Sequence, residues 1–339
     1  MKVESRRFLD TPTKSVHAAT IEFFNGNPVF SWFGGSREGA GDVSIYLHNL
    51  NGKGKNIIIG NKDAVPRWNP ILFAHEDRLW LFYKAGVFCD RWQTFVSDVT
   101  DWDSGVLDKE IQATAQFLPA GLNGPVKTKP IVSIKGNILC GSSVETLYDW
   151  TAYIEEYEVR EGWDYIDRSN PIYVKKKNVY QDPYSGRTKK SSGIIQPAIW
   201  IKDGEYHAFF RSSGGLEGVY YSKSSKFNQW SEPVKTNLPN PNSGVDTVYH
   251  NGKLYLVSNP DDTYRKPLTV QQIEKVSDSS WKVVDEVVVR EDIEEEDKFG
   301  VGHCISQELS YPYMVENDEK LHLVYTYGRS RIEYCTISL

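Results

Sequence analysis

The sequence predicts an all-β protein, and three observations lead to that expectation. Short apolar segments that begin with a polar residue recur six times, at spacings of 46 to 69 residues. Further runs rich in β-branched and aromatic residues follow each one, joined by short links rich in Asn, Asp and Gly that are typical of hairpin turns. No stretch has the period of a long amphipathic helix. A repeat of this length indicates a six-bladed β-propeller.

The repeats begin near residues 17, 69, 129, 196, 242 and 311. We expect strands over 17–24, 28–33 and 42–50; 69–74, 78–86 and 92–99; 129–134, 138–145 and 150–159; 196–201, 205–213 and 218–224; 243–249, 254–260, 267–274 and 281–289; 311–316, 321–328 and 331–339. The last repeat lacks a fourth strand, which residues 2–9 are expected to supply. That pairing would close the ring and remove an exposed sheet edge. The chain, 1–339, is then a single domain.

Two polar segments interrupt the repeats. Residues 161–192 carry a cluster of Lys and Arg, and residues 291–307 begin with the acidic run EDIEEED. Both are expected to be solvated surface loops, with a lid over one face of the propeller as the alternative.

The composition is that of a soluble globular protein, with 40% hydrophobic and 25% charged residues. The net charge of −6 gives no general attraction to nucleic acid or to an anionic membrane. No apolar run approaches the ~18 residues of a membrane span. The first residues, MKVESRRFLDTPTKS, lack the apolar segment of a secretory signal, so a cytoplasmic protein is expected. Export without a cleaved signal, or a viral origin, would leave no trace in these features.

No cofactor or metal is expected. The four cysteines are scattered without a C-x-x-C pair, and the seven histidines do not fall at ligand spacing. No glycine-rich phosphate loop follows a strand and opens a helix. The sequence carries no signal of the oligomeric state.

A propeller directs the start of each innermost strand at one central axis, and this predicts where the functional residues gather. The residues at these starts are His17, Asn69, Lys129, Gln196, Asn242 and Tyr311. The ends of the second strands add Arg37, Glu38, Asp42, Arg211 and Arg265. Guanidinium groups held close together repel one another unless anions compensate, and Glu38, Asp42 or Asp246 would do so only in part. An anionic ligand is therefore expected, and Arg matches a carboxylate with two parallel hydrogen bonds.

At these residues the chain resembles the sialidase (BNR repeat) superfamily. The segments that carry the resemblance are FGGSREG, RWNP, IIQP, LPNPNSG and LSYPY, in that order, and SKSSKFNQW is a degenerate form of the family's Asp-box turn. The resemblance implies a six-bladed propeller over nearly the whole length. It implies that Arg211 and Arg265 bind a substrate carboxylate and that Tyr311 is the nucleophile. Asp42 would be the acid/base, with Glu38 as its rival.

Two positions depart from the family pattern. His17 stands where the first of three carboxylate-binding arginines is expected, and Gln196 stands where the glutamate partner of the tyrosine is expected. An amide cannot take a proton from a phenol, so Glu308 or Asp246 would have to serve as the base. Arg37 would supply the missing guanidinium.

Three functions fit these residues, and the sequence favours the first. The first is an exo-acting glycoside hydrolase on an acidic sugar such as a sialic acid, with a tyrosine nucleophile. The second is a lyase on a uronic-acid polysaccharide, in which His17 or Tyr311 removes the proton next to the carboxylate. The third is a propeller that binds a glycan or a protein without catalysis.

Overall fold

The structure is a computed structural model that describes residues 1–50, 57–59, 63–101, 115–119, 121–146, 149–159, 162–175, 192–213, 215–294 and 307–339. These residues form β-strands almost throughout, with one short 3-10 helix, η1 (Cys89–Arg91). The prediction of an all-β fold is confirmed. None of the helical residues described forms a segment long and apolar enough to cross a membrane.

The strands form four sheets of four strands and one of eight within the described residues. The first two sheets are β2 (Ser15–Phe24), β3 (Asn27–Gly35), β4 (Ser44–Asn49) and β5 (Ile57–Ile59), and β6 (Arg67–His75), β7 (Arg78–Ala85), β8 (Gln93–Asp98) and β9 (Gln116–Phe117). The eight-stranded sheet holds β10 (Ile131–Val132), β11 (Ile138–Glu145), β12 (Asp149–Val159), β13 (Trp163–Arg168), β14 (Ser192–Lys202), β15 (Glu205–Ser213), β16 (Tyr220–Ser224) and β17 (Val234–Lys235). The last two are β18 (Asp246–His250), β19 (Lys253–Ser258), β20 (Leu268–Lys275) and β21 (Trp281–Arg290), and β22 (Leu309–Asn317), β23 (Lys320–Tyr327), β24 (Arg331–Ser338) and β1 (Lys2–Phe8).

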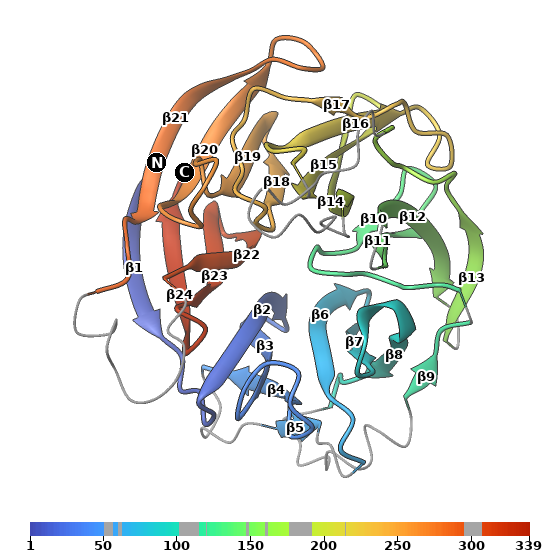
Figure 1. Ribbon diagram of the computed structural model, residues 1–339, viewed down its shortest axis with the longest axis vertical. Coiled ribbons are helices and arrows are strands. Elements are labelled where there is room, and N and C mark those ends of the chain that lie inside the picture. The colour runs from blue at the N-terminus through green and yellow to red at the C-terminus, as the bar shows by residue number, and fades with distance from the viewer. Residues whose placement is uncertain are drawn as a thin grey trace, which may run out of the picture.

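The sheets are arranged around a common centre, with β2, β6, β14, β18 and β22 toward the inside and β5, β9, β17, β21 and β1 toward the outside (Figure 1). Local turn chemistry explains the antiparallel pairs. Asn25–Gly26, Asp203–Gly204 and Asn251–Gly252 all adopt positive φ in two-residue turns, as the twist of a tight hairpin requires. Inner strands that are distant in sequence, such as β2 and β22, lie against one another.

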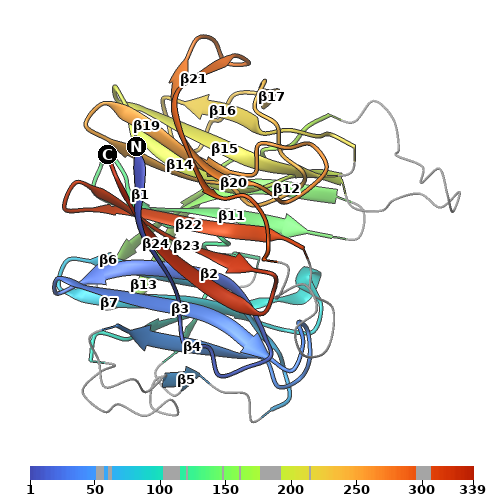
Figure 2. The ribbon, with the colours of Figure 1, turned by 90° about the vertical axis from the view of Figure 1, so that its left-hand side faces the viewer.

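The N-terminal strand completes the last sheet. β1 pairs antiparallel with β24, from Lys2 opposite Ser338 to Phe8 opposite Glu333. Figures 1 and 2 accordingly place the two chain ends side by side. The prediction that the first residues supply the missing fourth strand is confirmed.

One predicted loop is partly a strand. Within 161–192, Trp163–Arg168 forms β13, which pairs with β12. The Trp163 ring packs edge-on against Phe82 of the neighbouring sheet, with ring centroids 4.5 Å apart, and burial of this aromatic surface explains why the segment is held. The remainder of that candidate lid, 176–191, and most of the other, 295–306, lie outside the described residues.

A left-handed residue recurs at the start of the inner strands. Ala18, Asn69, Lys127, Gln196, Asn242 and Tyr311 all have φ between 44° and 69°. In β2, β6, β14 and β22 the residue lies inside a β-bulge, where the pairing register shifts. A small residue or proline follows in each case: Ala19, Pro70, Thr128, Pro197, Ser243 and Pro312. A bulge re-aims the side chain at its centre, which explains its use beside a site.

This geometry corrects the predicted register in two repeats. Ala18, not His17, occupies the position equivalent to Gln196 and Tyr311, and Lys127, not Lys129, occupies it in the third repeat. In the third repeat the left-handed residue precedes Thr128 rather than Pro130, so Thr128 takes the place that proline has in β6, β14 and β22.

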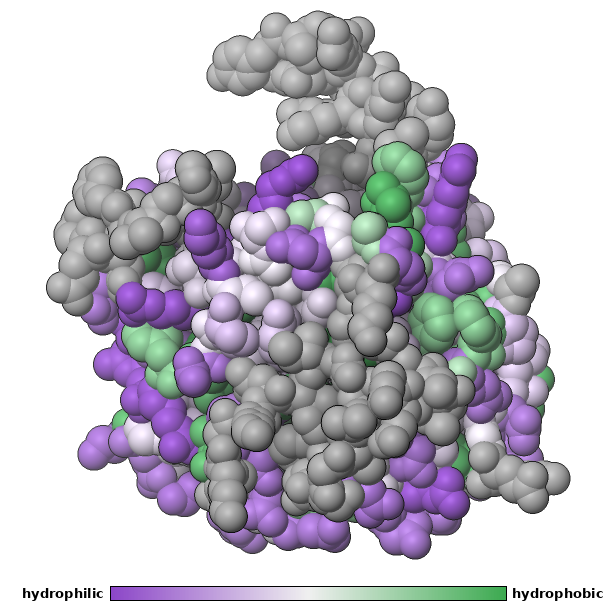
Figure 3. All heavy atoms as spheres, turned by 90° about the horizontal axis from the view of Figure 1, so that it is seen from below, coloured by the Kyte–Doolittle hydropathy of each residue, from purple (hydrophilic) through white to green (hydrophobic). Residues whose placement is uncertain are grey.

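Seen from the edge in Figure 3, the described surface is mostly hydrophilic, with separate small hydrophobic areas. Large apolar residues that are exposed, such as Phe88, Tyr173 and Val276, come from different sheets or from loops between strands. Scattered apolar residues of this kind are normal on a folded domain. These exposed apolar residues do not mark a binding site, so the residues at the starts of the inner strands are the candidates for a functional site.

Candidate active site

Tyr311 shares a closed set of hydrogen bonds with Arg211 and Gln196. The Tyr311 hydroxyl oxygen lies 2.9 Å from Arg211 Nη1 and 3.4 Å from Gln196 Nε2, and both nitrogens donate to it. Arg211 Nη1 also donates to Gln196 Oε1 at 3.3 Å. Gln196 and Tyr311 come from the bulges of β14 and β22, and Arg211 comes from β15. The phenol oxygen thus faces two donors, one of them a cation.

Asn242 holds two arginines in place. Its side-chain oxygen accepts a hydrogen bond from Arg211 Nε at 2.7 Å, and its backbone carbonyl accepts one from Arg265 Nη2 at 2.8 Å. The side-chain nitrogen of Asn242 donates to Ser213 Oγ at 3.2 Å. The left-handed backbone at Asn242 directs its backbone and side-chain oxygens to different guanidiniums, a conformation that Asn tolerates better than most residues.

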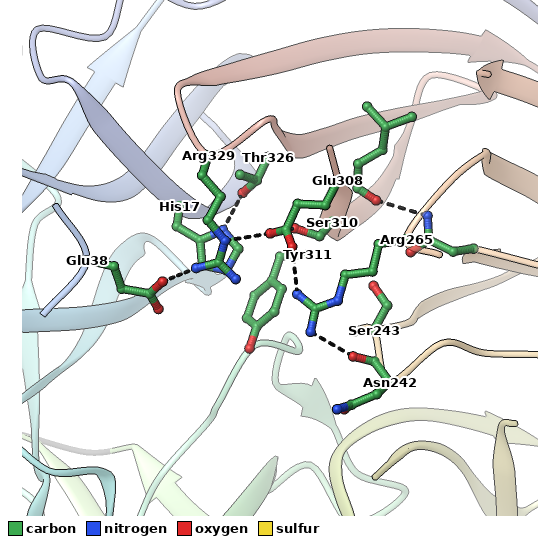
Figure 4. A network of polar contacts seen from close by, with 12 residues as sticks. His17, Glu38, Asn242, Ser243, Arg265, Glu308, Ser310, Tyr311, Thr326 and Arg329 are labelled. Carbon is green, nitrogen blue, oxygen red and sulfur yellow. Dashed lines mark hydrogen bonds and ion pairs between the residues drawn. The ribbon is translucent and has the colours of Figure 1, made fainter. Parts of the chain in front are cut away.

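Glu308 joins the second arginine to a third (Figure 4). Its Oε2 accepts from Arg265 Nη1 at 3.1 Å, and its Oε1 accepts from Arg329 Nε at 2.6 Å and from Ser310 Oγ at 2.8 Å. Arg329 Nη1 also pairs with Glu38. Arg329 follows β23, in the turn that leads to β24. The guanidinium groups of Arg211, Arg265 and Arg329 therefore lie in one hydrogen-bonded network beside Tyr311.

His17 is a neutral neighbour of Tyr311. The two ring centroids are 4.2 Å apart, and His17 Nδ1 lies 2.9 Å from Thr326 Oγ1. Burial holds the pKa of His17 well below its usual range, and the charges of Arg329, Arg265 and Arg211 lower it further. A cationic imidazole here would add to the positive charge, so the ring stays uncharged near pH 7.

Lys127 adds a fourth cation. It is buried, its Nζ donates to the Pro312 carbonyl and lies 6.0 Å from the centre of the Tyr311 ring, and burial lowers its pKa to about 8. Gly244 makes room for it, because a Cβ at that position would lie 2.9 Å from Lys127 Cε. Burial likewise lowers the pKa of Arg265, helped by the nearby Arg211 charge. These two shifts are the effect of cations held together away from water.

The cations outnumber the carboxylates that form ion pairs with them, while the charges of Glu145 and Asp246 also act on Arg211 and Lys127. The cationic groups are Arg211, Arg265, Arg329 and Lys127. Among the described residues, Glu308 and Glu38 form the ion pairs to these arginines. A buried cluster with excess positive charge is a ready site for an anion.

Five of the predicted site residues are connected here by hydrogen bonds: Gln196, Asn242, Tyr311, Arg211 and Arg265. His17, Glu38 and Glu308 also lie in the cluster. Glu308 contacts arginines and Ser310 rather than the Tyr311 hydroxyl. Its engagement by two cations places it as a counter-charge, and its expected role as the base for Tyr311 stays a prediction.

Three other predicted residues make no hydrogen bond to the three arginines in the described part of the chain, although the charges of Asp246 and Lys129 act on Lys127. Lys129 and Asp246 pair with each other, since Lys129 Nζ lies 2.9 Å from both carboxylate oxygens. Asp246 also accepts the Met314 N–H at 2.8 Å, so its carboxylate is committed within the sheet and is not a base for Tyr311. Asn69 is buried at its bulge, with no side-chain hydrogen bond to the cluster in the described part of the chain.

The loop after β3 keeps two predicted residues exposed. Asp42 accepts hydrogen bonds from the Ser36 N–H and hydroxyl, both at 2.9 Å, which fixes the carboxylate on the loop. Arg37 is exposed and makes no contact with the arginine cluster within the described residues. Arg37 was expected to supply the guanidinium missing at His17; Arg329 supplies a third guanidinium to the cluster instead.

The sequence reasoning missed Arg329 and Lys127. Arg329 lies just past the end of the second strand of its repeat, as Arg37 does in the first repeat, and that shared location was a usable signal. Lys127 was hidden because Lys129, two residues on, precedes the proline.

The family can now be stated. The BNR repeat-like domain matches residues 26–323. The chain belongs to this family. Among curated proteins, none matches the sequence.

Solved structures share the fold at low sequence identity. A protein of unknown function from Dyadobacter fermentans has a TM-score of 0.72 at 10% identity, with 100% of this chain and 99% of that chain covered. A Hadza microbial sialidase has a TM-score of 0.66 at 11% identity, with 96% of this chain and 66% of that chain covered. Trypanosoma rangeli sialidase in complex with sialic acid gives 0.58 at 12% identity, with 99% and 57% covered. This chain spans about two thirds or less of the length of the two sialidases.

Proposed function

We propose that this protein is an exo-acting glycoside hydrolase of an acidic sugar such as a sialic acid. The observation that carries the proposal is the excess of cations around one tyrosine. Arg211, Arg265 and Arg329 are held by fixed partners, so their positions are set before a ligand arrives. A carboxylate on the sugar would complete the charge balance and gain charge-assisted hydrogen bonds.

Tyr311 is the proposed nucleophile. Gln196 cannot accept its proton, but Arg211 and Gln196 both donate to the phenol oxygen and so hold it in a fixed position beside the arginines. The phenol oxygen would attack the anomeric carbon and release its proton to water, as the bond to the leaving oxygen breaks and that oxygen takes a proton from Asp42. The binding energy of the sugar carboxylate would hold the two atoms in line.

Asp42 is the proposed acid that protonates the leaving oxygen. Glu38, the rival, is tied to Arg329. Asp42 instead lies on an exposed loop and bonds only to Ser36 and the loop itself in the described residues. Asp42 is therefore the carboxyl of the two that makes no ion pair with the arginines among the described residues.

The architecture that supports this site is proposed to be a six-bladed propeller with a closed ring. The eight-stranded sheet is joined across its middle only by Asp149 opposite Ser192 and Trp150 opposite Gly193, so it reads as two blades of four strands. The six left-handed inner positions support the same count. The β1–β24 pairing would close the ring. A cytoplasmic location, an acidic saccharide as partner and the lack of a nucleic-acid partner remain predictions.

A uronate lyase is the second candidate, and the closeness of His17 to Tyr311 favours it. In that reaction the arginines neutralise the carboxylate, one of the two rings removes the adjacent proton and a double bond forms as the leaving group departs. The new 4,5-double bond absorbs ultraviolet light, and a hydrolase product does not.

The test is a screen of purified protein against fluorogenic glycosides of sialic and uronic acids, from about pH 4.5 to 8, with ultraviolet absorbance of uronate polysaccharides followed in parallel. Release of the fluorophore from an acidic glycoside, with little from its methyl ester, supports the hydrolase. Absorbance without hydrolysis supports the lyase. Binding of an acidic sugar with neither product would leave a glycan-binding propeller.

A further inference from the structure

A second pocket opens at the other end of the inner strands. Its volume is about 340 Å³, and residues from all the inner segments line it, among them Glu22, Phe73, Lys129, Ile199, Val248 and Val315. Glu22 follows His17 by five residues on β2, and Val315 follows Tyr311 by four on β22. At about 3.3 Å per residue the pocket lies roughly 13–17 Å along the strands from the arginine cluster. It is a separate site.

The cation in this pocket is already satisfied. Lys129 Nζ donates to both oxygens of Asp246 at 2.9 Å and to the Thr247 carbonyl at 2.8 Å. Those three bonds use all the donors of an ammonium group, and Asp246 offsets its charge. Lys129 therefore has no hydrogen to offer a ligand.

The two acidic residues that line the pocket are Glu22 and Glu316, and neither forms an ion pair with Lys129 in the described residues. Glu22 forms no ion pair within the described residues; its Oε1 accepts the Phe23 N–H at 2.9 Å, the Ala74 N–H also bonds to the carboxyl, and the charge of Lys129 acts on it from across the pocket. Burial raises the pKa of Glu22 to about 7. Glu316 lines the rim, where its carboxylate lies 3.3 Å from His250 Nδ1. The Glu22 carboxyl is thus the buried acidic group of this wall that has no ion-pair partner among the described residues.

The walls beyond Glu22 are apolar. Phe73, Ile199, Val248 and Val315 come from four different strands and converge on the same space. Pockets of a few hundred Å³ with apolar walls and a few placed polar groups are the usual form of small-molecule sites. The volume suits one ring with a short side chain.

We infer that this pocket binds a small organic cation, with a primary ammonium at the Glu22 carboxylate and an apolar body between Phe73 and Val248. The ammonium group pairs with the Glu22 carboxylate, which has no other ion-pair partner in the described residues. The apolar part of the ligand covers the apolar wall and so removes it from water. The inference does not depend on the proposed function of the arginine cluster.

Isothermal titration with benzylamine tests this inference, with benzyl alcohol as an uncharged probe of the same shape. We expect benzylamine to bind and benzyl alcohol to bind at least about tenfold more weakly, since a hydrogen bond to a charged group contributes roughly 1.5–3 kcal/mol. This comparison uses the wild-type protein alone. Equal affinity for the two probes, or no heat with benzylamine at about 10 mM, would overturn the inference.

Two variants of pocket residues test whether benzylamine binds in this pocket. Glu22→Gln should weaken benzylamine by at least about tenfold, and Val248→Trp should abolish binding by filling the pocket. Glu319→Gln is the matched control, because it removes the same charge from an exposed residue near the rim, outside the lining of the pocket. Benzylamine affinity that falls equally in Glu22→Gln and Glu319→Gln would contradict a pocket site.

Discussion

Glu308 is the residue on which the arginine cluster depends, and Glu308→Gln tests this directly. Its two oxygens accept from Arg265 and Arg329, and Ser310 donates to one of them. Glutamine keeps the shape and one acceptor oxygen. It removes the negative charge and points an NH₂ group at one of the guanidiniums. The variant therefore leaves two cations close together with a donor facing a donor.

The expected loss of stability follows from the burial of the groups. Removing one partner of a fully buried pair costs roughly 3–5 kcal/mol. The side chains of Glu308, Arg265 and Arg329 are 10%, 19% and 25% exposed, so water relieves part of that cost. We expect about 2 kcal/mol, measured by urea unfolding at low salt near pH 7. A bound anion should restore part of it, so acetate should stabilise the variant more than the wild type.

Glu38→Gln is the matched control, because it breaks the other carboxylate contact of Arg329. Glu38 is 42% exposed, and exposed pairs contribute at most about 1 kcal/mol. A Glu308→Gln variant that is no less stable than Glu38→Gln would refute the idea that Glu308 holds a strained cluster of cations. Acetate that stabilises both proteins equally would do the same.

Three further changes have defined outcomes. Arg211→Lys keeps the charge but loses the fork that reaches Tyr311 and Asn242, so titration with a free acidic sugar should show about tenfold weaker binding or more. His17 is buried uncharged with a lowered pKa, so the wild-type free energy of unfolding should fall as pH drops below about 6.5, and should fall less in His17→Gln. Burial raises the pKa of Glu22 to about 7, so the wild-type protein loses stability as pH rises from about 4.5 to 7 and this carboxyl ionises. Glutamine cannot ionise. In urea unfolding at about pH 8, Glu22→Gln should therefore be more stable than the wild type by up to about 3 kcal/mol.

The sequence predicted the parts of the structure that local chemistry determines. Asn25–Gly26 and Asn251–Gly252 specify tight hairpins by themselves, because few residues tolerate positive φ at both turn positions. The alternation of aromatic and β-branched runs then sets the strands between them. Tyr311 and Gln196 were found because a proline directly follows each of them in the sequence.

The rest depended on contacts between distant segments. His17 and Ala18 are adjacent, and only the bulge decides which one takes the inner position. The pairing of Glu308 with Arg329 and Arg265 depends on how three loops meet, which no spacing reveals. Asp246 looked like a base near the site until its partner Lys129 was placed beside it.

The most direct test of the proposed chemistry is to trap the sugar on the protein. A sialosyl fluoride with a second fluorine at C3 offers a good leaving group, and that second fluorine slows the later attack by water. We predict that the anomeric carbon bonds to the Tyr311 oxygen with release of fluoride, so that intact-mass spectrometry shows one added sugar and peptide mapping places it on Tyr311. An unchanged mass under conditions where the sugar binds, or an adduct that persists in Tyr311→Phe, would contradict the account.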